Sequence, residues 1–249
     1  MLKAVVVADM ARFGLEAERL GGVLSCPVYS VQDAPTARFQ IAVSSVLSVI
    51  MTVGSKSFTV CPDFNDSKLQ QRKQAGSKDL LVRACGLHKA DHRVRSVLDT
   101  TAGFGADALV LAAAGVQVKA FERDRLIYEL LVSAQQQVPS HSPEATLEFF
   151  HGDPAAQEMA VPADIVYMDP MFSGGMRKAL STKNMMFLQE WLCDEYAIED
   201  QSDTFHWALE QARQRVVVKR SKKAGFLDKI KPTFQIMGKT HRFDVYQRG

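Results

Sequence analysis

From about Ser96 onward, short apolar runs rich in β-branched residues alternate with stretches in which apolar residues recur at helical spacing. This alternation is typical of a parallel sheet covered by helices. The pattern predicts strands at 96–100, 116–121, 146–150, 164–168 and 215–219. Two further runs, 233–237 and 242–246, are too close for a crossover helix and are predicted to form an antiparallel hairpin. We therefore expect an α/β fold, a Rossmann-like seven-stranded sheet with an antiparallel terminal hairpin.

Two of the intervening helices have recognisable ends. Apolar residues keep helical spacing over 126–138, behind Asp124 as a possible N-cap, and Pro139 follows the last of them. The preceding helix, over roughly 105–114, is predicted to stop at Gly115.

The first 95 residues have a different pattern. Residues 38–63 are mostly apolar and β-branched, with a turn at 54–55 and no helix-length interruption, which predicts a small antiparallel sheet. We therefore divide the chain into a small N-terminal α+β subdomain, residues 1–95, and a Rossmann-like domain, residues 96–249.

The segment 68–86 has the composition of a helix but carries a glycine, Gly76, in its interior. Glycine is unfavourable inside a helix and common at helix ends. The sequence therefore predicts a break at Gly76, with Ser77 capping a second helix.

Composition excludes several classes of protein. A chain of 249 residues with 47% hydrophobic and 23% charged residues is neither a disulfide mini-scaffold nor a disordered tail. The four cysteines lie at least 24 residues apart, so no local Cys-x-x-Cys metal or redox pair exists, and we expect no metal. The longest apolar run, 41–53, is too short to span a membrane. No signal peptide is recognisable, so we expect a cytoplasmic protein with no membrane partner.

The near-neutral total charge hides an asymmetry. Residues 213–249 hold 11 Lys and Arg but only two Asp and no Glu, a net charge of +9, whereas residues 1–212 carry −7. A basic segment on an acidic body suggests a polyanionic partner such as nucleic acid. Solvated lysines on an edge strand would give the same charge pattern.

The first chemical motif is a strand that runs into a glycine turn and a helix, over 97–107. In open α/β sheets the ligand binds at this place, beyond the carboxyl end of the strand. Gly103 and Gly105 allow the backbone to approach a ligand closely. Asp99 and Asp107 would repel a pyrophosphate but suit a cationic amino group and a sulfonium.

Two more candidates follow the next strands. Glu122 lies 23 residues after Asp99, where a carboxylate accepts hydrogen bonds from both hydroxyls of a ribose. Arg123 is placed to cover an adenine face, and Asp153, before Pro154, to contact the adenine amino group. Each feature also has an interpretation without a ligand. An acid at the end of a strand is common at the start of a helix, and Gly-Asp-Pro is common in ordinary turns.

The sharpest motif is the buried strand 164–168 followed by Asp169-Pro170-Met171-Phe172. It resembles the [Asp/Asn]-Pro-Pro-[Tyr/Phe] motif of methyltransferases that act on exocyclic amino groups. Asp169 and the Pro170 carbonyl would accept the amine N–H hydrogens, and Phe172 would stack on the target base. The proline fixes the turn on which these oxygens converge.

Basic residues after this motif and in the C-terminal segment are candidate RNA contacts, since phosphate contacts give affinity without sequence information. His241 has no metal-spaced partner and is interpreted as structural or RNA-facing. The RNA-binding candidates are Arg177, Lys178, Lys183, Lys219, Arg220, Lys222, Lys223, His241 and Arg242.

From about Asp63 onward the chain resembles the bacterial small-subunit ribosomal RNA guanine-N2 methyltransferases of the RsmJ type. The resemblance is carried, in order, by Arg72-Lys73, Asp99-x-Thr101-Ala102-Gly103-x-Gly105-x-Asp107, Glu122-Arg123, Tyr167-x-Asp169-Pro170-Met171-Phe172, Arg215-Val216-Val217-Val218-Lys219-Arg220 and His241-Arg242-Phe243-Asp244-x-Tyr246. It implies the class I methyltransferase fold, S-adenosyl-L-methionine (SAM) as methyl donor, a guanine of 16S rRNA or of the 30S subunit as acceptor, and N2-methylguanosine as product. By position it places cofactor contacts at Ala106, Asp107, Glu122, Arg123, Asp153, Pro154 and Asp169.

Three alternatives remain open at this point. A nicotinamide-dependent oxidoreductase would use Glu122 in the same way, but Ala108 stands where its third loop glycine belongs and Asp-Pro-Met-Phe would have no role. The motif alone also allows an amino-methyltransferase acting on DNA or a protein side chain. A non-catalytic RNA-binding or assembly protein of this fold would keep the basic C-terminus but would not need the cofactor loop.

Overall fold

The computed structural model describes residues 3–88, 93–139, 142, 146–157, 161–170, 183–192 and 199–248. The chain forms two compact units. The N-terminal unit comprises residues 1–63, 125–137 and 178–195, and the C-terminal unit comprises the rest. The segment 64–95, which we predicted to belong to the N-terminal subdomain, clusters with the C-terminal unit.

The N-terminal unit is built on a five-stranded sheet of order β2-β1-β3-β4-β5. The first three of these strands are parallel to one another, and β3, β4 and β5 form antiparallel pairs. The antiparallel part confirms the sheet predicted over 38–63, whereas the parallel start was not predicted. The bounds are β1 Ala4–Ala8, α1 Met10–Leu24, β2 Val28–Ser30, β3 Phe39–Val43, β4 Ser48–Val53, β5 Lys56–Val60, α5 Arg125–Gln135 and α6 Lys183–Trp191.

Long-range contacts bring α5 and α6 into this unit. Glu129 of α5 is buried and accepts a hydrogen bond of 2.7 Å from the Arg19 guanidinium of α1. Phe39 of β3 packs edge-on against Phe187 and Trp191 of α6, at 5.7 and 5.2 Å between ring centroids. Such aromatic pairs add to the burial of apolar area.

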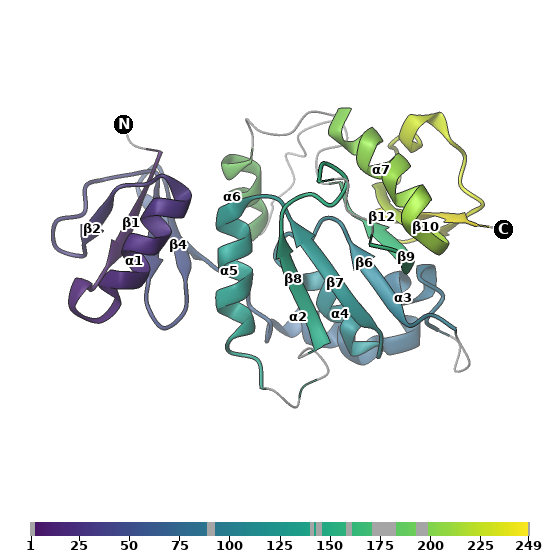
Figure 1. Cartoon of the computed structure of the whole chain (residues 1–249), viewed down its shortest axis with the longest axis horizontal. Coiled ribbons are helices and arrows are strands. Elements are labelled where there is room, and N and C mark those ends of the chain that lie inside the picture. Colours follow the sequence, from purple (N-terminus) through teal and green to yellow (C-terminus); the bar gives the residue numbers. More distant parts are fainter. Residues whose placement is uncertain are drawn as a thin grey trace. The chain divides into compact units, whose positions relative to one another are not determined.

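The C-terminal unit contains a seven-stranded sheet of order β11-β12-β10-β9-β6-β7-β8 (Figure 1). The strands β10, β9, β6, β7 and β8 are parallel, and β12 runs antiparallel to both β10 and β11. This confirms the predicted strands and the terminal hairpin. The bounds are β6 Ser96–Asp99, β7 Gln117–Glu122, β8 Leu147–His151, β9 Ala163–Met168, β10 Ala212–Ser221, β11 Phe234–Met237 and β12 His241–Gln247.

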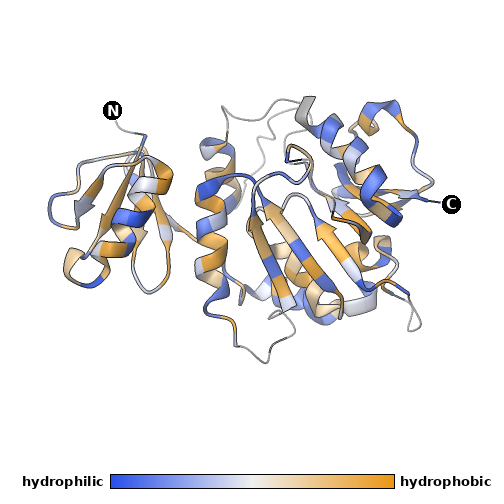
Figure 2. Ribbon diagram, in the orientation of Figure 1, coloured by the Kyte–Doolittle hydropathy of each residue, from blue (hydrophilic) through white to orange (hydrophobic). Residues whose placement is uncertain are grey.

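Helices cover both faces of this sheet. The helices α2 (Ser67–Ala75), α3 (Leu80–Ala84) and α4 (Ala106–Ala113) lie on one face, and α7 (Glu199–Gln211) lies on the other (Figure 1). The central strands are therefore apolar along most of their length (Figure 2), and residues 216–218 of β10 are fully buried. The parallel strands end at one edge of the sheet, which is where Asp99, Glu122 and Asp169 stand.

The helix break at Gly76 is confirmed, but its details differ from the prediction. Gly76 has a positive φ of +49° and begins a short 3-10 turn over Gly76–Lys78. The next helix, α3, is capped by Asp79, whose Oδ1 accepts hydrogen bonds from the backbone N–H groups of Leu81 and Val82. Ser77 lies inside the 3-10 turn and does not cap α3. Among the described residues, no helix has the length and apolar character needed to cross a membrane.

Candidate active site

Asp99, at the end of β6 and the start of the loop that follows, is a buried carboxyl with one oxygen that has no hydrogen-bond partner among the described residues. Oδ1 of Asp99 accepts a hydrogen bond of 2.9 Å from the backbone N–H of Thr101, and Oδ2 has no partner among the described residues. Gly103 and Gly105 have φ of +55° and +78°, a conformation that side chains with a Cβ rarely adopt. Gly105 then leads into α4, whose first N–H groups face this turn.

Glu122 lies beside the same loop. Its Oε2 accepts a hydrogen bond of 2.9 Å from the Gly103 N–H, and its Oε1 accepts one of 2.9 Å from the Asp124 N–H. The Glu122 backbone carbonyl in turn accepts the N–H of Gly152, which joins the end of β8 to the end of β7. The three strand ends predicted to bind one ligand therefore meet at one place.

These two carboxyls suit a nucleoside cofactor that carries a positive charge. Burial raises the pKa of Asp99 to about 8 and the pKa of Glu122 to about 7, although backbone hydrogen bonds oppose both shifts. A buried carboxyl with an unused oxygen is stabilised by a cation or a hydroxyl donor. The unpartnered Oδ2 of Asp99 can take an ammonium group, and the remaining lone pairs of Glu122 can take ribose hydroxyls. The residues present therefore fit SAM.

Thr101 connects this loop to the Asp169 motif. Its hydroxyl donates to Oδ1 of Asp99 at 3.2 Å and accepts the backbone N–H of Asp169 at 2.7 Å. The Thr100 N–H donates to the Tyr167 carbonyl at 3.0 Å. The turn at Asp169-Pro170 is thus held against the loop after β6 by the Thr101 hydroxyl and by the backbone hydrogen bond between Thr100 and Tyr167.

Lys219 of β10 bridges two carboxylates at this edge. Its Nζ donates to Oδ2 of Asp169 at 2.7 Å and to Oδ2 of Asp107 at 2.9 Å. Asp107 also accepts hydrogen bonds of 2.6 Å from the Tyr167 hydroxyl and 2.6 Å from the Arg72 guanidinium. We call Arg72, Asp107, Tyr167, Asp169 and Lys219 the ionic network.

The pKa shifts of the network follow from burial and pairing. Burial opposes the charged form of Asp107, but the charges of Lys219 and Arg72 outweigh it and lower its pKa well below the ordinary value. Burial raises the pKa of Asp169, and the Lys219 ammonium opposes that shift. Lys219 itself has a raised pKa because the two carboxylates outweigh its burial. Lys219 therefore stays protonated at neutral pH.

Three of the residues predicted to contact RNA, Lys219, Arg220 and Arg242, make contacts within the protein instead. Lys219 lies in the ionic network and not on a solvated surface. Arg242 is 4% exposed, pairs with Asp244 at 2.8 Å and donates to the backbone carbonyls of 221, 222 and 224. Arg220 is also buried, and its Nη2 donates to the Gly225 carbonyl. These arginines hold the turn after β10 together.

The other candidates keep the position expected of them or fall outside the described residues. Lys222 and Lys223 are exposed, and His241 is half-buried at the start of β12, where burial and the charge of Lys219 lower its pKa. Lys183 is exposed and belongs to the N-terminal unit. Phe172, Arg177 and Lys178 lie outside the described residues.

The remaining cofactor candidates lie close to the loop. Asp153 caps its own turn, because its Oδ1 accepts the N–H of Ala155 at 2.9 Å, and Pro154 is buried beside it. Ala106 is exposed at the first position of α4. Asp107 was expected to contact the cofactor, but its two oxygens are taken by Arg72, Tyr167 and Lys219.

Sequence reasoning did not assign a role at the site to Arg72, Tyr167 or Thr101. Tyr167 lies within the apolar strand β9, so its buried hydroxyl requires a partner, and this is a signal that the sequence contained. Arg72 comes from α2, and no local pattern indicates that it reaches Asp107, 35 residues away.

Comparison with known proteins gives a consistent result. A family model described as "Putative SAM-dependent methyltransferase" matches residues 27–248. The chain is 36% identical to ribosomal RNA small subunit methyltransferase J of Alcanivorax borkumensis, over 78% of this chain and 77% of the relative. It is 33% identical to the protein of the same name from Thioalkalivibrio sulfidiphilus, over 94% and 93% of the two chains. The crystal structure of a SAM-dependent methyltransferase from Neisseria gonorrhoeae covers 98% of this chain and 95% of its own, with a TM-score of 0.71 and 26% identity.

Proposed function

The chain belongs to the ribosomal RNA small subunit methyltransferase J family, and on that premise we propose that it methylates the exocyclic N2 of a guanine in 16S rRNA, with SAM as methyl donor. The observation that carries this proposal is the convergence of Asp99, Glu122 and Asp169 at one edge of the sheet. The first two carboxyls match a nucleoside cofactor, and the third begins an Asp-Pro turn suited to an amine.

SAM supplies an electrophilic methyl group on a sulfonium. The protein binds the cofactor, orients the amine and accepts its proton. Asp99 and Glu122 bind the cofactor. The Asp169 carboxylate and the Pro170 carbonyl accept the two N–H hydrogens of the guanine amine and orient its nitrogen. Most of the acceleration then comes from positioning.

Asp169 also receives the proton that the amine loses after methyl transfer. Lys219 is a positioning residue, because it holds the Asp169 carboxylate at 2.7 Å and favours its charged form. By its place in the sequence, Phe172 stacks on the target base. Neither a metal nor a covalent enzyme intermediate is needed for this reaction.

The RNA contacts in this proposal are the exposed Lys222 and Lys223, with His241 beside the ionic network and Lys183 as a contact from the N-terminal unit. Arg220 and Arg242 are assigned to the structure of the turn, since their side chains are buried. Arg177 and Lys178 remain RNA candidates on the strength of the sequence alone.

The direct test is transfer of a labelled methyl group from SAM to 30S subunits and to protein-free 16S rRNA, followed by nucleoside analysis. We expect N2-methylguanosine in at least one substrate. A different methylated nucleoside would refute the assignment to guanine N2. SAM binding without any labelled RNA would refute the acceptor, and the absence of SAM binding would favour a non-catalytic RNA-binding protein.

Glu122→Gln should weaken SAM binding by about tenfold, because an amide is a poorer acceptor for two ribose hydroxyls than a carboxylate. Calorimetric titration with SAM at pH 7.5 measures the change. Asp124→Asn, on the neighbouring residue, is the matched control and should bind SAM like the wild type.

The same pair of proteins gives a pH test. Since burial raises the pKa of Glu122 to about 7, the acid is neutral below that pH and the wild-type affinity should fall as pH decreases from 7.5 to 5.5. The ratio of wild-type to Glu122→Gln affinity should shrink over this interval, which separates Glu122 from other titrating groups. A constant ratio would contradict a role for the ionised carboxylate.

A further inference from the structure

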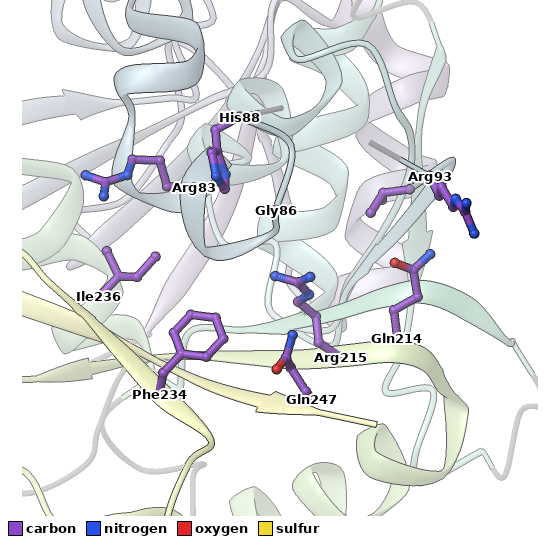
Figure 3. Close-up of a pocket in the computed structure, with 10 residues that line it drawn as sticks. Arg83, Gly86, His88, Arg93, Gln214, Arg215, Phe234, Ile236 and Gln247 are labelled. Carbon is purple, nitrogen blue, oxygen red and sulfur yellow. The ribbon is translucent and has the colours of Figure 1, made fainter. Parts of the chain in front are cut away.

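A cavity lies at the edge of the seven-stranded sheet opposite the candidate active site. It has a volume of about 530 Å³ and is lined by Arg83, Gly86, His88, Arg93, Val94, Gln214, Arg215, Phe234, Ile236 and Gln247 (Figure 3). Arg93 precedes β6, Arg215 is near the start of β10, and Phe234 begins β11. The parallel strands therefore start at the cavity and end at the candidate active site.

The lining is cationic. It contains three arginines, a histidine and two glutamines, and no carboxylate among the described residues. Arg83 and Arg93 are exposed, and within the described part of the chain neither guanidinium has a salt bridge. Arginines at a concave surface without acidic partners bind phosphate, because their planar fork matches two phosphate oxygens.

The side chain of Arg215 is fixed by contacts with the loop at Ala84 and Gly86. Its Nη1 donates to the Ala84 carbonyl at 3.3 Å, and its Nε is buried without a partner among the described residues. Gly86 has a φ of +75°, and a Cβ there would come within 2.9 Å of Nη1 of Arg215. The glycine therefore lets the guanidinium lie against the loop at the wall of the cavity.

Phe234 adds an aromatic surface to the cationic one. Phe234 is 38% exposed although it is large and apolar. In Figure 3 the side chains of Phe234 and Arg215 both point toward the loop at Gly86. A base stacks on such a ring regardless of its identity, while arginines bind the adjoining phosphate.

We propose that this cavity binds a short segment of the rRNA substrate away from the methylated guanine, with one base on Phe234 and separate backbone phosphates on Arg83, Arg93 and Arg215. This inference rests on the proposed function, since the ligand is a part of the same RNA. The cavity contributes to substrate affinity and takes no part in chemistry.

The test compares Arg83→Gln/Arg93→Gln with Lys56→Gln/Lys119→Gln, which removes two exposed cations outside the cavity. Methyl transfer to 30S subunits or 16S rRNA is measured at several salt concentrations. For the cavity variant we expect KM for the RNA to rise about tenfold. The slope of the logarithm of the binding constant against the logarithm of the salt concentration should become less steep, by about 0.7–0.9 for each phosphate that the protein no longer neutralises. Its kcat and SAM affinity should stay at the wild-type level, and the control should keep the wild-type KM.

Phe234→Ala provides an independent arm. It should raise KM for the RNA without changing the salt dependence, since stacking removes no charge. An unchanged KM and salt slope in both cavity variants would overturn the proposal, as would binding of inorganic phosphate alone with RNA affinity unaffected. If the wild type methylates neither substrate, the proposed function has failed, which is a distinguishable result.

Discussion

Replacing Asp169 with alanine is expected to lower kcat for methyl transfer by about 100- to 10,000-fold, the range for losing a side chain that accepts a proton in the reaction. The turn that carries Asp169 should survive, because its backbone N–H donates to Oγ1 of Thr101 and this hydrogen bond does not involve the carboxylate. Lys219 keeps Asp107 as a partner. The measurement is single-turnover methyl transfer at saturating SAM.

A matched control is Asp164→Ala, at the other end of the same strand. Its carboxylate accepts hydrogen bonds from the backbone of Arg95 and Ser96, so its loss should lower stability but leave kcat unchanged. If Asp169→Ala binds SAM and turns over at the wild-type rate, Asp169 has no catalytic role and the proposed mechanism is wrong.

The seven-stranded sheet was predictable because its parallel strands are buried on both faces and so appear as continuous apolar runs. The start of the chain carried a weaker pattern. In α1 the buried residues are Ala17, Leu20 and Gly21, two of which are small, so few large apolar side chains mark the buried face of this helix. The assignment of α5 and α6 to the N-terminal unit depends on contacts such as Arg19 with Glu129, 110 residues apart, which no local pattern reveals.

In the candidate site, too, some residues were predictable from the sequence and others were not. Asp99, Glu122 and Asp169 were predictable because each stands where a parallel strand ends, and topology brings such ends to one edge. The expectation that Arg242 is RNA-facing rested on its place in the basic C-terminal segment, and the total charge of a segment does not show which of its cations are paired. Arg242 and Asp244 are two apart on one strand, so they share a face and can pair. That register argument was available from the sequence.

The ionic network explains why two acids, Asp107 and Asp169, can lie side by side: the Lys219 ammonium pairs with both. The stabilising contribution of Lys219 is present below its ordinary pKa of 10.5 and is lost only as pH rises through the raised folded value. The contribution of Asp107 is present above its ordinary value of 3.8 and is lost as pH falls through the lowered folded value. The Lys219–Asp107 pair therefore remains charged throughout the neutral range.

Lys219→Met should destabilise the protein by about 3 kcal/mol at pH 7, the lower end for breaking a buried ion pair, because the lysine side chain is still 24% exposed. Asp107 keeps Arg72 and Tyr167, whereas Asp169 loses the ammonium and its pKa rises further. The stability loss should shrink toward pH 4 as that carboxyl becomes protonated. Urea unfolding at pH 7 and pH 4 measures both effects.

A structural role alone would not change the pH dependence of the remaining activity. With the ammonium gone, Asp169 ionises at higher pH, so the rate of Lys219→Met should rise toward alkaline pH compared with the wild type. Lys219→Met/Asp169→Asn removes the unpaired carboxylate as well and should recover part of the lost stability while remaining inactive. Wild-type stability together with a wild-type pH profile in Lys219→Met would show that the network neither stabilises the fold nor positions Asp169.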